Sequence, residues 1–189
     1  IYEIVWFQIL QLVIGSSAVS LGILLATYMG GLCLGSLFFA NLVSARRHPL
    51  RVFALLEMGI AVLGLAILWC VPHLDRFYTS LFSSRLSVGL RAVICILALL
   101  GPTFLMGATL PAVSRWLETS RRGASWLGFL YGGNIAGAML GCLLAGFLLL
   151  RLYDVIVATC VAAAINVGVA VIAWALGLRT QGSRLPAPG

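Results

Sequence analysis

Five long runs of apolar residues constrain this chain more than any other feature, and they lie at about 18–43, 50–71, 92–114, 125–150 and 154–177. An α-helix needs about 20 apolar residues to cross the hydrocarbon core of a bilayer, and each run reaches or approaches that length. The spans must be helices, because a lone strand leaves its backbone groups unpaired in lipid and no alternating barrel pattern occurs. We therefore predict an all-α, polytopic membrane helix bundle.

A shorter segment precedes these runs and completes the predicted bundle. It is about fourteen residues long and carries Glu3, so we expect it to be the end of a helix whose beginning is absent. With it, residues 1–177 form a bundle of about six transmembrane helices. An amphipathic pattern over 74–87 predicts a short helix lying in the outer interface. Residues 178–189 are polar and rich in proline and glycine, which predicts a linker-like tail.

Composition and charge agree with a membrane location. The chain is 62% hydrophobic and 9% charged, with a mean hydropathy of +1.11, which excludes a soluble globular domain and a disordered chain. All twelve basic residues are arginine, and eight of them fall on one side of the predicted topology against four on the other. The positive-inside rule then places the 44–51 loop, the 115–124 loop and the C-terminal tail in the cytoplasm. No basic stripe interleaved with aromatic residues exists, so nucleic-acid binding is not expected.

Three polar residues within the apolar runs are the candidates for a functional interior: Glu57, Asn134 and Glu3. A carboxylate inside a membrane is costly and is usually turned inward and paired. Glu57 is compatible with a structural role or with a proton or cation relay, and an arginine near the same boundary (46, 47 or 51) is a possible partner. Asn134 is compatible with a hydrogen bond between helices or with contact to a solute.

Small residues spaced four apart predict where helices touch, because close packing drives helix association in lipid. One stripe contains Gly31 and Gly35, and a longer stripe contains Gly133, Gly137 and Gly141. Both are compatible with tight packing alone or with sliding surfaces in a transporter. Two prolines, Pro102 and Pro111, interrupt the fourth run, and a kink is expected there.

Catalytic and metal-binding patterns are missing from the sequence. The two histidines, His48 and His73, lie on opposite predicted sides of the membrane, so no metal cluster is expected. No phosphate-binding, dinucleotide-binding or nucleophile-elbow motif occurs, and the five acidic residues are scattered. We expect no cofactor and no enzymatic activity from this chain.

Several short motifs occur in order along the chain: Tyr2-Glu3-x-x-Trp6, Gly15-Ser16-Ser17, Leu34-Gly35-Ser36, Leu56-Glu57-x-Gly59, Met106-Gly107-Ala108-Thr109-Leu110-Pro111 and Tyr131-x-x-Asn134-x-x-Gly137-Ala138-x-x-Gly141. As a set they resemble the membrane domain of bacterial fused transporter-like/spermidine-synthase-like proteins, and the resemblance covers about residues 1–177. The resemblance implies a domain similar to half of a major-facilitator transporter, in a bacterial cytoplasmic membrane. It also implies that an aminopropyltransferase-like soluble domain usually follows; that domain is absent from this chain, so its activity is not carried over.

These observations leave two functions open for this chain, and an aminopropyltransferase activity is expected only if a soluble domain follows it in the full protein. The chain is expected to be a non-catalytic integral-membrane domain, which could move a small polar or cationic solute such as a polyamine with Glu57 as its charge partner. The alternative is a structural or accessory subunit packed within a larger membrane complex. Six helices are half of a usual transporter, so the expected partners are the lipid bilayer and either a second copy of the chain or a larger complex.

Overall fold

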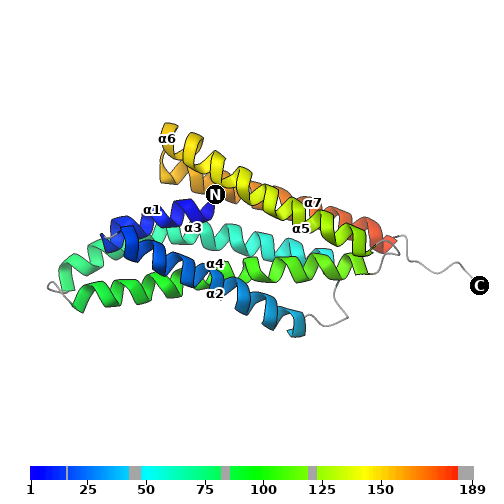
Figure 1. Cartoon of the computed structure of the whole chain (residues 1–189), viewed down its shortest axis with the longest axis horizontal. Coiled ribbons are helices and arrows are strands. Elements are labelled where there is room, and N and C mark those ends of the chain that lie inside the picture. The colour runs from blue at the N-terminus through cyan, green and yellow to red at the C-terminus, as the bar shows by residue number, and fades with distance from the viewer. Residues whose placement is uncertain (16, 43–47, 82–85, 119–122, 183–189) are drawn as a thin grey trace, which may run out of the picture.

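The computed structural model describes residues 1–189 apart from 16, 43–47, 82–85, 119–122 and 183–189. All the secondary structure in the described residues is helical, as the apolar runs predict, so the expected all-α helix bundle is confirmed. The elements are α1 (Tyr2–Ile14), α2 (Ser17–Leu42), α3 (Pro49–Leu81), α4 (Leu86–Glu118), α5 (Gly123–Leu143), the π-helical η1 (Leu144–Leu149), α6 (Leu150–Leu152) and α7 (Val155–Gly182). They form an elongated bundle (Figure 1).

Five spans in the described residues are long and apolar enough to cross a membrane: Ala18–Phe39, Pro49–Cys70, Ala92–Trp116, Trp126–Leu152 and Val155–Arg179. Each of them coincides with one of the predicted apolar runs. Large apolar side chains are exposed along these helices, which is the arrangement that a lipid environment requires. The chain is therefore a multi-pass membrane protein.

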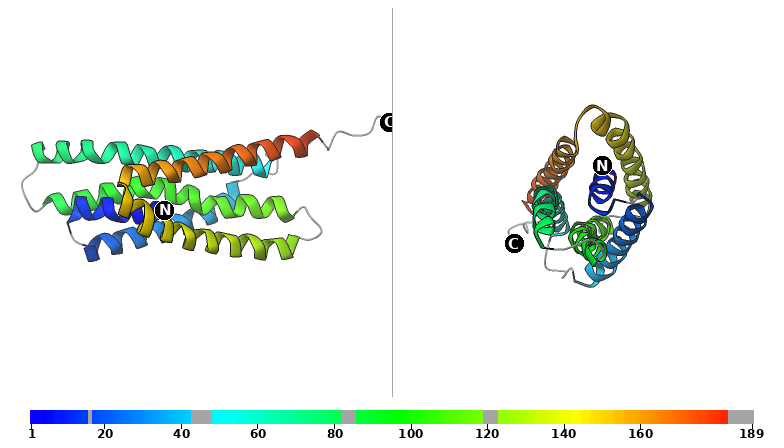
Figure 2. Two further views of the ribbon diagram at one scale, coloured as in Figure 1. Left: turned by 90° about the horizontal axis from the view of Figure 1, so that it is seen from above. Right: turned by 90° about the vertical axis from the view of Figure 1, so that its left-hand side faces the viewer.

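Helix α1 lies inside the ring formed by the other helices (Figure 2). Its inner face is the best-buried part of the bundle, since Val5, Trp6 and Leu10 are at most 1% exposed. The helix ends at Gly15, which adopts a left-handed conformation with φ of +82° and donates its N–H to the Gln11 carbonyl at 2.9 Å. Glycine fits this position because a Cβ disfavours positive φ.

Helices α2 and α4 make the most extensive contact in the bundle. A Cβ on Gly31 would lie 2.6 Å from the Thr103 Cβ, and one on Gly35 would lie 2.9 Å from the Phe104 carbonyl carbon. The reverse contact comes from Gly107, where a Cβ would lie 2.7 Å from the Leu32 Cα. The absence of side chains at these three glycines is what lets the two backbones approach.

Helix α3 packs on both α4 and α7 through other small residues. Ala54 of α3 meets Ala170 and Ala173 of α7 in a buried cluster. On the other side of α3, Leu56 packs with Ala108 and Ala112 of α4. Helices α2, α3, α4 and α7 thus form a continuous, closely packed wall.

Two local features differ from the sequence-based picture. Helix α3 continues without a break from Pro49 to Leu81, so residues 74–81 of the predicted interfacial helix are the end of α3. Residues 82–85 lie outside the described residues, and the placement of 74–87 in the interface stays a prediction. The run at 125–150 is also not one regular α-helix, because it widens into a π-helix at Leu144–Leu149 before the turn to α7.

Helix α4 remains helical through both Pro102 and Pro111. Pro102 is buried, and the next residue, Thr103, donates its hydroxyl to the Leu99 carbonyl at 2.8 Å. The same hydroxyl lies 3.2 Å from the Leu100 carbonyl, so it is bonded within its own helix. The kink expected at these prolines stays a prediction.

Candidate functional site

A cavity of about 1200 Å³ lies within the bundle, lined by residues from α1, α2, α3, α4, α5 and α7. It is open, since Met29 and Tyr131 on its wall are 64% and 59% exposed. Its polar lining comprises one carboxylate, two amides and several hydroxyls, contributed by Glu57, Asn134, Asn166, Tyr2, Tyr28, Tyr131, Ser36, Thr109 and Ser114. Most of the other lining residues are apolar, and among the residues described Glu57 is the only charged one that lines the cavity.

Glu57 reaches the cavity from the inner face of α3. It is followed at helical spacing by Ile60, Ala61 and Gly64, of which Ile60 and Ala61 are at most 2% exposed. Gly64 leaves room for the ring of Tyr2, because a Cβ there would lie 2.6 Å from the Tyr2 Cε1. Glu57 and Tyr2 line the same cavity.

No ion-pair partner for Glu57 is found in the described part of the chain. Of the three arginines considered as partners, two (46 and 47) lie outside the described residues. The third, Arg51, has its guanidinium carbon 5.6 Å from the ring centroid of Trp174 on α7. This stacking directs the guanidinium of Arg51 to the α3–α7 contact, while Glu57 faces the cavity.

The hydroxyls of the cavity wall present acceptors to its interior. Ser36 donates its hydroxyl to the Cys33 carbonyl at 2.9 Å, Thr109 to the Met106 carbonyl at 2.7 Å, and Ser114 to the Pro111 carbonyl at 3.1 Å. Since a hydroxyl has a single hydrogen, each of these oxygens keeps only its lone pairs for another partner. The wall formed by α2 and α4 therefore offers acceptors to a bound solute.

Pro111 adds one more acceptor to the same wall. A proline has no N–H, so the carbonyl four residues earlier in the helix loses its regular donor. That carbonyl belongs to Gly107, and both Gly107 and Pro111 line the cavity.

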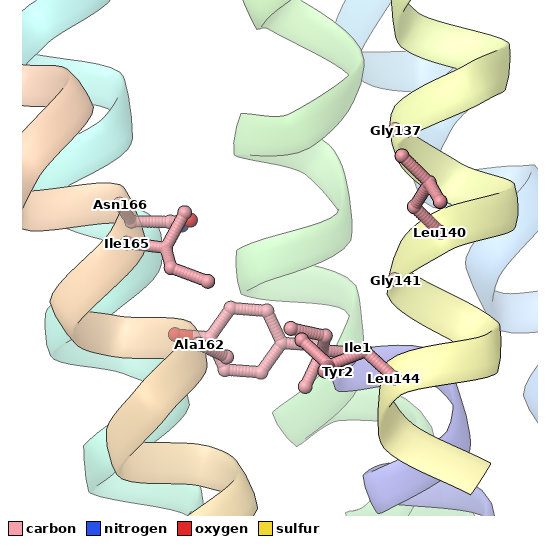
Figure 3. A pocket seen from close by; sticks show the side chains of 9 residues that line it. All are labelled: Ile1, Tyr2, Gly137, Leu140, Gly141, Leu144, Ala162, Ile165 and Asn166. Atoms are coloured by element: carbon pink, nitrogen blue, oxygen red, sulfur yellow. The ribbon is translucent and has the colours of Figure 1, made fainter. Parts of the chain in front are cut away.

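Tyr2 supplies an unpartnered donor at the inner end of the cavity. Its side chain is 6% exposed, stacks on Trp6 with ring centroids 5.2 Å apart, and its hydroxyl has no hydrogen-bond partner among the described residues. Figure 3 shows the Tyr2 ring lying between α5 and α7, with its hydroxyl toward α7. A buried hydroxyl without a partner is uncommon, because its desolvation is not compensated.

A second pocket of about 460 Å³ continues from the cavity between α5 and α7. The two share Tyr2, Gly137, Ile165 and Asn166, and the additional lining of the second pocket is apolar or backbone. The side chain of Asn166 extends from α7 into the space between the helices (Figure 3). The cavity that contains Glu57 therefore has an apolar extension, formed by this second pocket.

The predicted site residues are brought together only in part. Glu57 and Asn134, which are 77 positions apart in the sequence, line the same cavity. Glu3 does not line it. The three tyrosines and Asn166 were not among the predicted site residues, although Tyr2 and Tyr131 each begin one of the short motifs that carry the family resemblance.

The two glycine stripes have different surroundings. Gly31 and Gly35 lie against α4, as a packing stripe should. A Cβ added to Gly133 or Gly137 would meet no described atom within 4 Å, and both residues line the cavity. A Cβ on Gly141 would lie 3.3 Å from the Ile1 nitrogen. The α5 stripe is thus a cavity wall over most of its length rather than a helix contact.

No protein-family model matches this chain, and no curated protein or solved structure was found to match it. Within the described residues, no group of three or more histidine, cysteine or acidic side chains is arranged to hold a metal ion.

Proposed function

We propose that this chain is the membrane domain of a spermidine-synthase-like protein, and that its cavity binds and passes a small cationic solute such as a polyamine. One observation carries the transport part of this proposal. The cavity of about 1200 Å³ has a single charged residue in its described lining, the carboxylate of Glu57. The solute is held there as the counter-charge of Glu57.

Membrane energetics support this role for Glu57. An acidic side chain at the centre of a membrane helix costs about 2.5–3.5 kcal/mol or more, so such residues mark ion or substrate pathways. No described side chain neutralises Glu57. A cation entering the cavity would supply the missing partner, and the hydroxyl and carbonyl acceptors around it would accept the hydrogen bonds of an ammonium group.

Family membership and orientation rest on the sequence. The ordered motifs from Tyr2 to Gly141 support a spermidine-synthase-like membrane domain that resembles half of a major-facilitator transporter. The excess of arginine in alternate loops supports a cytoplasmic position for the C-terminal tail, and the family resemblance implies a bacterial cytoplasmic membrane.

Uptake of radiolabelled spermidine into liposomes that contain the full polypeptide tests the transport proposal. We expect Glu57→Gln to lower uptake by about tenfold or more, since a buried charge pair loses one partner. Asp154→Asn is the matched control, because it removes the same charge at an exposed turn outside the cavity. Equal uptake by the wild type and Glu57→Gln would remove Glu57 from the mechanism.

A second function, that of an accessory subunit in a larger membrane complex, is favoured by the outer face of α5. Gly128 and Gly132, one turn apart, have no described atom within 4 Å of a Cβ position and border a shallow groove with Phe129. Helices of another chain approach closely at such residues. Purification in mild detergent separates the two functions: stable co-isolation with a larger assembly favours the subunit, and a homodimer stabilised by solute favours transport.

A further inference from the structure

We infer that, among the small cationic solutes that the cavity can bind, it prefers an organic monocation with an apolar body to a polyamine. This inference rests on the proposed function and narrows its substrate class. Three properties of the cavity carry it: the number of its charges, the direction of its hydrogen bonds, and the chemistry and size of the rest of its wall.

The charge of the wall matches one ammonium group. Glu57 is the only charged side chain in the described lining, and the two other strongly polar side chains, Asn134 and Asn166, are neutral amides. A second ammonium group on the same solute would move from water into the cavity and find no counter-charge there. This transfer is unfavourable in a site surrounded by protein and lipid. A solute with several amino groups is therefore bound less well than one with a single charge.

The hydrogen-bonding groups that line the cavity together with Glu57 fit a primary ammonium, which carries three donors and no acceptor. The α4 wall presents the lone pairs of Thr109 and Ser114 and the Gly107 carbonyl freed by Pro111. Together with the Glu57 carboxylate, these groups provide more acceptors than the three that one ammonium group requires.

The remainder of the wall fits an apolar body. Tyr2, Tyr28 and Tyr131 present aromatic rings, which pack on apolar groups and also attract a cation over their faces. The cavity is larger than the roughly 300–1,000 Å³ of a typical small-molecule site, and its apolar extension adds about 460 Å³ lined by residues such as Leu140 and Leu144. A slender polyamine chain leaves most of this apolar surface uncovered.

Equilibrium binding of three probes to the purified full polypeptide in detergent tests the inference. Phenylbutylamine carries one charge and an apolar body, phenylbutanol has the same body without the charge, and spermidine has several charges without the body. We expect phenylbutylamine to bind about tenfold or more tightly than either of the others. This comparison uses only the wild type, so it does not depend on the folding of a variant.

Two variants link the selectivity to the site. Glu57→Gln should abolish the preference for the amine over the alcohol. Glu57→Asp should retain part of this preference, and the control Asp154→Asn should retain all of it. Spermidine binding that depends on Glu57 and equals or exceeds that of phenylbutylamine would overturn the inference and leave the proposed function standing. If none of the probes, spermidine included, binds in a manner that depends on Glu57, both the inference and the proposed function fail.

Discussion

Replacement of Gly35 by alanine should force α2 and α4 apart and destabilise the bundle. The new Cβ would lie 2.9 Å from the Phe104 carbonyl carbon and 3.1 Å from the Ala108 nitrogen, and closer still to the Phe104 oxygen. All three are backbone atoms of α4, so no side-chain rotation can relieve the overlap. The helices must separate locally before the methyl group fits.

The cost of that separation follows from the way membrane helices associate. Lipid chains are as apolar as the helix surface, so contact between α2 and α4 depends on close van der Waals packing. Overpacking a well-packed contact costs about 1–3 kcal/mol. We expect a loss in this range, because the displaced contact is the most extensive one in the bundle and also includes the close approaches at Gly31 of α2 and Gly107 of α4.

Thermal unfolding of the purified protein in detergent measures this cost, with Gly30→Ala as the matched control. Gly30 lies on the same helix, five residues earlier, and a Cβ there meets no described atom within 4 Å. Both variants gain the same intrinsic helix propensity, about 0.5–1 kcal/mol, so their difference isolates the clash. If Gly35→Ala unfolds at the same temperature as Gly30→Ala, then α2 and α4 do not approach each other closely at Gly35.

Two further substitutions test other parts of the structure by the same unfolding measurement. Tyr2→Phe should raise the stability of the solute-free protein by about 1–3 kcal/mol, because it removes a buried hydroxyl without a partner; a marked loss of stability would mean that this hydroxyl is hydrogen-bonded. Trp174→Leu should lower the stability by about 0.5–2 kcal/mol, because it removes the ring over which Arg51 lies at 5.6 Å. Trp174→Leu should leave solute binding unchanged, since Trp174 does not line the cavity. A large loss of binding would contradict the position of Trp174 outside the cavity.

The spans could be predicted from the sequence because they depend on length and hydropathy alone. A run of about 20 apolar residues has few alternatives to a membrane helix, so each run coincides with an observed span. Glu57 and Asn134 could be selected for a similar reason, since a carboxylate or an amide in such a run needs an explanation. Neither argument uses the positions of neighbouring helices.

Helix pairing could not be predicted from the sequence in the same way. Of the two glycine stripes, the one on α5 is longer, yet it is the stripe on α2 that packs closely on another helix. The spacing of small residues identifies a face that can accept a close neighbour, but it does not identify the helix that lies there. The surroundings of Gly133 and Gly137 depend on where α1, α2 and α7 leave space.

The walls of the cavity also differ in how firmly they are held. Glu57 and the acceptors of α4 belong to the wall of α2, α3, α4 and α7, in which glycine and alanine contacts fix the backbones. Tyr131 and Asn134 belong to α5, whose exposed residues from Trp126 to Leu140 make few contacts within the described chain. A displacement of α5 would therefore disrupt less packing than a displacement of any helix that carries Glu57 or its acceptors. The side of the cavity that carries Glu57 is thus held by more packing than the opposite side that carries Tyr131 and Asn134.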